Sequence, residues 1–142
     1  MAKKSIPQER KDIQELKQRQ AFLTDANRST AVKKRHASGK RTARENIDDL
    51  CDADSFDEIG SLIVAGQKGR KSIQELREHT PADGLITGIG KINATAFDKN
   101  TNCYILSYDY TVLAGTQGAF GNKKTDRLMA LAEKANCPIL FF

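Results

Sequence analysis

The stretch LAGTQGAFGNKKTDRLMALA, residues 113–132, places three glycines three residues apart, at Gly115, Gly118 and Gly121. The run before it, CYILSYDYTVL, is rich in β-branched and aromatic residues and is typical of a strand. Residues 122–135 are predicted to form a helix whose apolar stripe consists of Leu128, Met129, Leu131 and Ala132. Many proteins that hold a phosphate or cofactor with backbone amides have this order of strand, glycine loop and helix.

The glycine spacing G-x-x-G-x-x-G matches none of the common nucleotide-binding signatures. A dinucleotide fold needs G-x-G-x-x-G and a P-loop needs G-x-x-x-x-G-K-[ST], and neither register fits. The glycines would still let backbone amides approach a ligand, and a helix N-terminus favours an anion or oxyanion. A tight connection from strand to helix explains the same residues, so both interpretations stay open.

A β-hairpin is expected on the N-terminal side of this loop. Its strands are Leu85–Phe97 and Cys103–Val112, joined by the turn-forming residues DKNT. On the other side, Pro138 stops the helix, and CPILFF is expected to be a buried strand. Because an apolar strand normally leads into a further turn, we expect the chain to be part of a longer protein, the alternative being a C-terminal strand inserted into a sheet.

The N-terminal part has a different character, and we divide the chain into a basic helical arm at residues 1–50 and a partial domain at 51–142. One helix is expected over residues 8–28, with an apolar stripe formed by Ile13, Leu16, Phe22 and Leu23. A second is expected over residues 41–51, where Thr42 and Glu45 have the spacing of a capping box.

Between the arm and the hairpin, two further elements are expected. Residues 55–66, SFDEIGSLIVAG, have strand character, and the polar segment after them is expected to carry a short helix at 71–78.

The charge is concentrated in the arm. Residues 1–46 carry a net charge of +8 and the remainder −3, within a total of +5. The excess indicates either an anionic partner or a solvated helix face. No apolar run approaches the roughly 20 residues of a membrane span, and the N-terminus lacks the apolar core of a secretory signal. Three cysteines without a CxxC pair argue against zinc or disulfides and favour a reducing cytosol.

Side chains that suggest catalysis are few. His36 and His79 are isolated, and no serine lies in a G-x-S-x-G elbow. Asp109 could act as an acid or base, but a turn or capping carboxylate is favoured at such a position. The residues alone therefore predict an α/β unit that cradles a ligand and carries a basic helical arm.

Four segments in order add a family resemblance: RHASGKRTARENIDDL, DADSFDEIG, PADGLITGIGKI and YDYTVLAGTQGAFGNKKTDRLMALAEKANCPIL. Together they resemble the N-terminal half of the carboxyltransferase (β) subunit of biotin-dependent acyl-CoA carboxylases, of the propionyl-CoA carboxylase β-chain type. The resemblance covers residues 15–142, and the family also includes decarboxylases.

The resemblance implies a crotonase-like (ClpP-like) α/β fold of ββα units, incomplete here and preceded by the helical arm. It implies that the full protein transfers a carboxyl group between carboxybiotin and an acyl-CoA without a metal. Backbone amides would stabilise the thioester enolate and the biotin oxyanion, which explains why no catalytic side chains stand out. No catalytic residue is assigned, because the oxyanion segment is expected beyond Phe142.

The resemblance also implies an acyl-CoA site and partners. The cations of the arm would lie near the CoA phosphates and the glycine loop would form one wall of the pocket. The expected acyl-CoA-binding residues are Arg35, Lys40, Arg44, Gly115, Thr116, Gln117, Gly118 and Phe120. If residues 35–44 are partly helical, the spacing of four residues places Lys40 and Arg44 on one helix face. Biotin would sit on a carrier protein or domain, with a biotin carboxylase as second partner, in a cytoplasmic homo-oligomer.

Several residues depart from the family pattern. Ser38, Arg41 and Asn46 differ from R-G-K-L/M-T-A-R-E-R-I, and Ala114 and Gln117 differ from the G-G-S-x-G loop. The acyl chain is therefore not specified. A nucleic-acid-binding module that uses the arm is one alternative and a non-catalytic assembly fragment is another. We expect no acyl-CoA turnover by this chain alone and at most millimolar binding of CoA.

Overall fold

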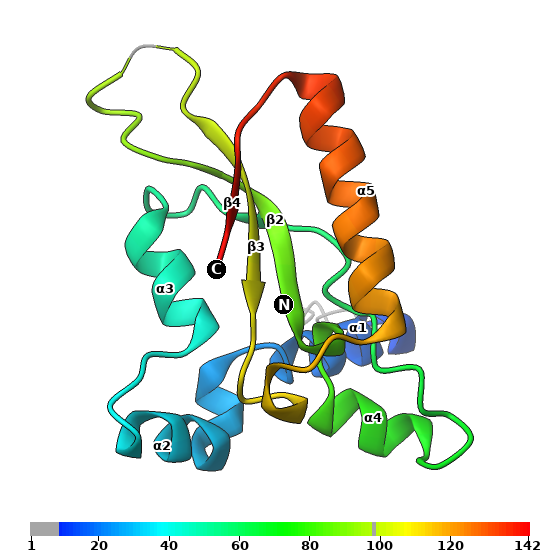
Figure 1. Cartoon of the computed structure of the whole chain (residues 1–142). Coiled ribbons are helices and arrows are strands. Elements are labelled where there is room, and N and C mark those ends of the chain that lie inside the picture. The colour runs from blue at the N-terminus through cyan, green and yellow to red at the C-terminus, as the bar shows by residue number, and fades with distance from the viewer. Residues whose placement is uncertain (1–8, 98) are drawn as a thin grey trace, which may run out of the picture.

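The computed structural model describes residues 9–97 and 99–142 and places five helices and four strands in them (Figure 1). The helices are α1 (Lys11–Ala21), α2 (Ser29–Ala37), α3 (Ala43–Leu50), α4 (Ile73–His79) and α5 (Ala119–Ala135). The strands are β1 (Asp57–Glu58), β2 (Leu85–Lys91), β3 (Asn102–Tyr108) and β4 (Ile139–Phe141). Short 3₁₀ turns lie at Asp25–Arg28, Ala82–Gly84 and Leu113–Gly115.

The strands form one sheet in the order β1-β2-β3-β4. The predicted hairpin of β2 and β3 is confirmed, with Gly88 opposite Ile105, but both strands are shorter than expected. β2 ends early because the Asp52 carboxylate accepts the amides of Asn93 and Ala94, which removes them from the ladder. β4 then pairs with β3 in parallel.

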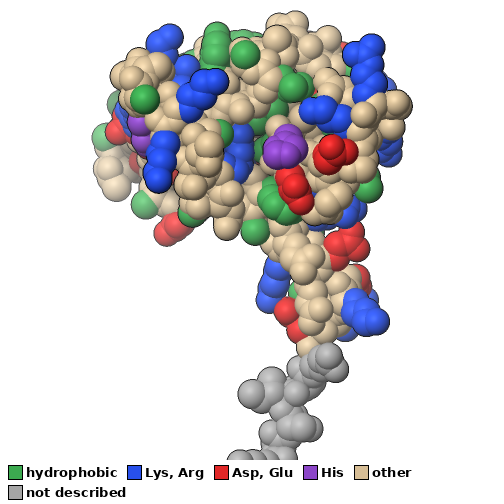
Figure 2. Space-filling model, turned by 90° about the horizontal axis from the view of Figure 1, so that it is seen from below, with side chains coloured by type: hydrophobic (Ala, Val, Ile, Leu, Met, Phe, Trp, Pro, Cys, Tyr) green, Lys and Arg blue, Asp and Glu red, His purple; other side chains and the backbone are tan. Residues whose placement is uncertain are grey.

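The arm is interrupted where one long helix was expected. α1 ends at Ala21, and Thr24 is extended, so the segment up to Arg28 forms a separate 3₁₀ turn; residue 8 lies outside the described residues. Ile13 and Leu16 are more than a third exposed, whereas Leu23 is buried. Seen from below, the first described residues of the arm project from the body of the molecule (Figure 2).

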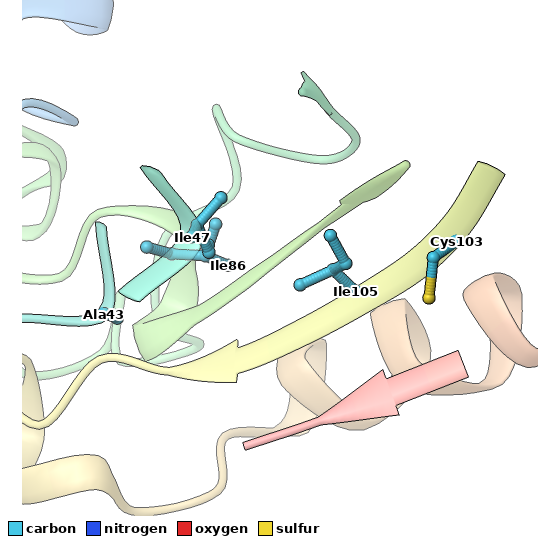
Figure 3. Close-up of a cluster of buried hydrophobic side chains, with 5 residues drawn as sticks. All are labelled: Ala43, Ile47, Ile86, Cys103 and Ile105. Atoms are coloured by element: carbon cyan, nitrogen blue, oxygen red, sulfur yellow. The ribbon is translucent and has the colours of Figure 1, made fainter. Parts of the chain in front are cut away.

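Two helices cover opposite faces of the hairpin, because side chains along a strand alternate between its faces. On one face, Ala43 and Ile47 of α3 pack against Ile86, Cys103 and Ile105 (Figure 3). On the other face, α5 contributes Leu128 and Ala132 to a cluster with Leu85, Tyr104 and Leu106. The hairpin, α5 and β4 therefore form the expected ββα arrangement, with a strand after the helix.

α5 begins three residues before the predicted start and ends as expected before Pro138. Asn136 adopts the left-handed conformation, with φ 50°, and its amide donates to the Ala132 and Glu133 carbonyls. Met129 was expected in the apolar stripe with Leu128, but it is 47% exposed because it lies about 100° around the helix from the fully buried Leu128.

Two strand predictions were wrong in part. Within residues 55–66 only Asp57 and Glu58 pair as a strand, because Gly60, with φ +73°, starts a turn that is closed by the Ile63 amide. β4 forms where expected but is exposed, since it lies at the sheet edge and pairs with β3 alone. Among the described residues, no helix is both long and apolar enough to cross a membrane.

Candidate functional site

The glycine loop leaves β3 and turns back on itself before α5. Leu113, Ala114 and Gly115 all have positive φ, at 46°, 55° and 74°. The Gly115 amide donates to the Val112 carbonyl at 2.9 Å, and the Thr116 amide to the Leu113 carbonyl at 3.2 Å. These two amides therefore close the turn and are not free for a ligand.

The N-terminus of α5 is occupied by a carboxylate from the chain itself. Oδ2 of Asp83 accepts the Phe120 amide at 3.0 Å and the Gly121 amide at 2.8 Å. Gly118 caps the helix and lies directly against this carboxylate, which a Cβ at that position would overlap. The helix dipole thus finds its anion in Asp83, in place of the ligand anion that the sequence suggested.

Lys124, one turn further along α5, binds the segment that contains Asp83. Its Nζ donates to the Ala82 carbonyl at 3.0 Å and to the Leu85 carbonyl, and the residue is only 6% exposed. Burial lowers the pKa of Lys124 to about 8, although the nearby carboxylates of Glu58 and Asp83 act in the opposite direction.

The arm and the glycine loop meet at a hollow beside Tyr110. The Arg35 guanidinium lies over the Tyr110 ring, 4.8 Å from its centroid, while Arg35 Nε donates to the Arg41 carbonyl at 2.9 Å. A Cβ at Gly115 would come within 3.0 Å of the same ring. The hollow has a volume of about 360 Å³ and is lined by Ala31, Lys34, Arg35, Ser38, Tyr110, Thr111 and Ala114.

A buried ion pair holds the arm against the start of the loop. Arg28 Nη1 lies 2.7 Å from Asp109 Oδ2, and the two side chains are 8% and 7% exposed. Arg28 also donates to the Thr111 hydroxyl, and Asp109 Oδ1 accepts the Thr111 amide at 2.9 Å. Asp109 therefore acts as the turn carboxylate that its position favoured.

The other two predicted cations of the arm lie away from this hollow. Lys40 is exposed and lines a separate hollow of about 420 Å³ beside His36. Arg44 Nη1 lies 3.0 Å from Glu58 Oε2, and its side chain is 21% exposed. Lys40 and Arg44 do not share a helix face, because the helix through residues 35–44 that this required is absent: α2 ends at Ala37, Gly39 has φ +70°, and α3 begins only at Ala43.

The remaining predicted residues spread along the loop. Thr116 is exposed and its hydroxyl donates to the Leu113 carbonyl at 2.9 Å. Gln117 is also exposed. No described residue accepts a backbone hydrogen bond from the main-chain N–H of Gln117 or of Gly118. Phe120 is 37% exposed and lies beside Gly66, outside the Arg35 hollow.

Of the eight predicted residues, then, Arg35 lines the hollow, and Gly115 supports it through Tyr110. The sequence analysis missed Lys34, Tyr110 and Asp83. Tyr110 was placed inside the expected strand Cys103–Val112, whereas β3 ends at Tyr108 and leaves Tyr110 in the loop. Asp83 was hidden in PADG, which reads as a turn.

Comparisons with known proteins indicate one family. The family described as "Carboxyl transferase domain" matches residues 34–142. The chain is 30% identical over 131 residues to the methylmalonyl-CoA carboxyltransferase 12S subunit of Propionibacterium freudenreichii subsp. shermanii, covering 92% of this chain and 23% of that protein. It is 40% identical over 111 residues to the biotin-dependent acetyl-/propionyl-coenzyme A carboxylase beta5 subunit of Mycobacterium tuberculosis, covering 78% of this chain and 18% of the relative.

Solved structures give the same result. A single-chain, multi-domain long-chain acyl-CoA carboxylase matches with a TM-score of 0.91 and 46% identity, over 95% of this chain and 14% of that one. The transcarboxylase 12S hexamer, solved with methylmalonyl-CoA, matches with a TM-score of 0.69 and 31% identity, over 92% of this chain and 24% of that one.

The likeness to these structures confirms the expected crotonase-like α/β fold class. The chain spans less than a quarter of the length of the curated relatives named above, 23% and 18% respectively. The sequence match, the fold and the segment order agree, and the chain belongs to the carboxyl transferase domain family.

Proposed function

We propose that this chain supplies part of the acyl-CoA pocket of a carboxyltransferase that moves a carboxyl group between carboxybiotin and an acyl-CoA. The family match and the named activities of the relatives support this proposal. Both carboxylating and decarboxylating relatives occur, the latter represented by the methylmalonyl-CoA decarboxylase subunit alpha of Propionigenium modestum.

The observation that carries the proposal is the hollow where the arm meets the glycine loop. It combines two cations, Lys34 and Arg35, with the ring of Tyr110, which is 57% exposed. The terminal nitrogens of Arg35 donate to no described residue, since only its Nε is engaged. Coenzyme A presents phosphates and an adenine ring, which suit guanidinium and ammonium groups and an aromatic face respectively.

The affinity of this surface should be low. Contacts between exposed charges contribute ~0.5–1 kcal/mol each, so two or three of them give millimolar binding at most. The chain's own residues thus bind and orient the nucleotide end of the substrate, and we assign no catalytic side chain among them. Turnover would need further parts of the carboxyltransferase.

The wider arrangement follows from the relatives and is part of the proposal. Biotin would be carried by a partner protein or domain and carboxylated by a biotin carboxylase, in the cytoplasm. A homo-oligomer is supported by the hexamer of transcarboxylase 12S. Residues 1–50 would act as the arm and 51–142 as part of the carboxyltransferase domain.

The test is a titration of the chain with CoA at low and high salt, in which NMR measures binding. Lys34→Ala/Arg35→Ala should weaken binding by about tenfold, and salt should weaken the wild type because exposed charges are screened. The matched control is Lys33→Ala/Lys40→Ala, which removes the same charge from exposed positions outside the hollow. Equal losses in both variants would show that only bulk charge acts and would reject the site.

The same titration tests the nucleic-acid alternative. Lys and Arg side chains stand at several separate places on the face seen from below, with Asp and Glu among them (Figure 2). A continuous basic stripe would be the usual footprint of nucleic-acid binding. A short oligonucleotide that bound more tightly than CoA, with a steeper salt dependence, would favour that alternative.

A further inference from the structure

We propose that Asp83 is a positioning residue that holds the glycine loop in place, with Gly118 as its required partner. The proposal rests on the proposed function in one respect, namely that this loop forms a wall of the acyl-CoA pocket. Asp83 does not touch the Arg35 hollow, so it would act on the ligand only through the loop.

The turn at Ala82–Gly84 contacts both ends of the loop. At the start, the Gly84 carbonyl accepts the Asp109 amide at 2.9 Å, and a Cβ on Gly84 would come within 3.2 Å of Val112. At the end, Asp83 accepts the two amides of α5 and lies against Gly118. The span from Val112 to Gly118 is therefore fixed at both sides by one turn.

The turn itself is held in an unusual conformation. Ala82 and Asp83 have φ of 55° and 52°, in the left-handed region that residues with a Cβ seldom adopt. Such a backbone persists where surrounding contacts determine it. The contacts here are the two amides on Asp83 Oδ2 and the Lys124 ammonium on the Ala82 carbonyl.

Asp83 also replaces a cap that α5 lacks. The N-cap residue is Gly118, which has no side chain to accept an amide, and a side chain there would displace the carboxylate. Asp83 is 2% exposed, and its second oxygen, Oδ1, has no partner among the described residues. The amides of Phe120 and Gly121 are thereby closed to a ligand, and recognition of phosphate falls to the arm.

The first experiment follows amide hydrogen exchange by NMR and needs no ligand. Asp83→Ala should speed exchange at Phe120 and Gly121 by about tenfold, while Ile105 in β3 keeps its protection. Asp83→Asn should restore most of the protection, because the amide oxygen is an acceptor and Asn tolerates the left-handed region. The control is Asp54→Ala, since Asp54 shares the positive φ, at 56°, but is exposed.

The second experiment measures CoA affinity at a temperature where each variant is folded. Asp83→Ala and Gly118→Ala should each weaken binding by about fivefold, and Asp83→Asn should recover it, if the loop is a wall of the pocket. Ile47→Val, which destabilises the opposite face of the sheet, should leave the affinity unchanged.

The two experiments separate the two ideas. Unchanged exchange at Phe120 and Gly121 in Asp83→Ala overturns the positioning role, whatever CoA does. Faster exchange with unchanged CoA affinity also overturns it. A wild-type chain that binds no CoA rejects the proposed function, and the exchange data then decide the loop contact alone. If Asp83→Ala fails to fold, Asp83→Ser replaces it, because the shorter side chain cannot reach both amides.

Discussion

α3 and α5 both begin at a well-capped N-terminus, but the caps come from different places. At α3, the Thr42 hydroxyl accepts the Glu45 amide at 3.1 Å, and the Glu45 carboxylate accepts the Thr42 amide at 2.7 Å. At α5, the acceptor is Asp83, 37 residues before the first amide that it binds. The N-terminal cap of α3 is therefore specified by residues next to it in sequence. The N-terminal cap of α5 forms only when the turn at Ala82–Gly84 packs against the start of that helix.

The same division separates other contacts in the molecule. The left-handed Asn136 that ends α5 is a local device, like the capping box. The pair of Arg28 and Asp109, 81 residues apart, and the contacts of Lys124 with Ala82 and Leu85 are long-range and buried. Removal of a long-range contact should cost more stability than removal of a local one, because it leaves buried polar groups without a partner.

The largest effect is expected at the buried ion pair. Arg28→Met should lower the free energy of unfolding by about 3–5 kcal/mol, because Asp109 is left as an uncompensated buried charge. Urea denaturation measures the change. Arg10→Met is the matched control, since its pair with Asp12 is exposed and should contribute about 0–1 kcal/mol. Similar decreases in the free energy of unfolding in both variants would contradict the contrast between buried long-range contacts and exposed local ones.

The next effect is a pH dependence that comes from Lys124. Its folded pKa of about 8 lies below the unfolded value of about 10.4, so between these values the unfolded state binds the extra proton. The free energy of unfolding should therefore rise with pH over this window, by up to about 3 kcal/mol. Below pH 8, Lys124 is charged in both the folded and the unfolded state, and this gain in the free energy of unfolding is absent.

Urea denaturation at pH 7.5 and pH 10.5, on wild type and Lys124→Met, isolates this contribution. Other groups that titrate in the window are present in both proteins, so the difference between the two profiles belongs to Lys124. Parallel profiles would show that its pKa is not lowered.

A smaller effect is expected at the local cap of α3. Thr42→Ala should destabilise the protein by about 1 kcal/mol, because the first turn of α3 loses an acceptor. Ser72→Ala at α4, which has the same capping box with Glu75, should behave alike. A loss as large as that of Arg28→Met would mean that α3 depends on Thr42 for more than its own end, for example through the Thr42 hydroxyl bond to Asp25.

The smallest effect is expected at the C-terminus of α5. Asn136→Gly should change stability by less than about 0.5 kcal/mol, since both residues adopt the left-handed conformation and glycine does so more readily. Thermal unfolding followed by circular dichroism is sufficient to check it. A clear destabilisation would indicate that the Asn136 side chain has a role that its backbone geometry does not explain.

The contrast between local and long-range contacts also explains what the sequence could predict. The hairpin, α3 and α5 were predictable because strand composition, the DKNT turn and the Thr42–Glu45 spacing act over a few residues. The predictions of one long helix in the arm and of a strand over residues 55–66 failed. The extended backbone at Thr24 interrupts the helix, and the positive φ of Gly60 ends the strand. The family was identified from the order of four sequence segments, and this order can be seen without knowing which residues contact one another in the fold.

The site was predictable only in part for the same reason. Arg35, Lys40 and Arg44 were named through the family resemblance, but which cations of the arm face the loop depends on where α2 ends and α3 begins. Lys124 looks like a solvated lysine in GNKKT, and its burial follows from docking against the turn before β2. Asp83 could not be connected with α5, because no local pattern joins residues 37 positions apart.

The edge strand β4 has a practical consequence for handling this protein. Pro138 and Phe142 direct their backbone groups to β3, so by the alternation of a parallel ladder those of Ile139 and Phe141 face outward. Residues 139–142 are all apolar, 36–51% exposed, and contain neither a charge nor a proline. Such an edge is a template for pairing with another extended chain. We therefore expect self-association through β4, before any loss of folding, to limit the concentration at which the chain remains dispersed.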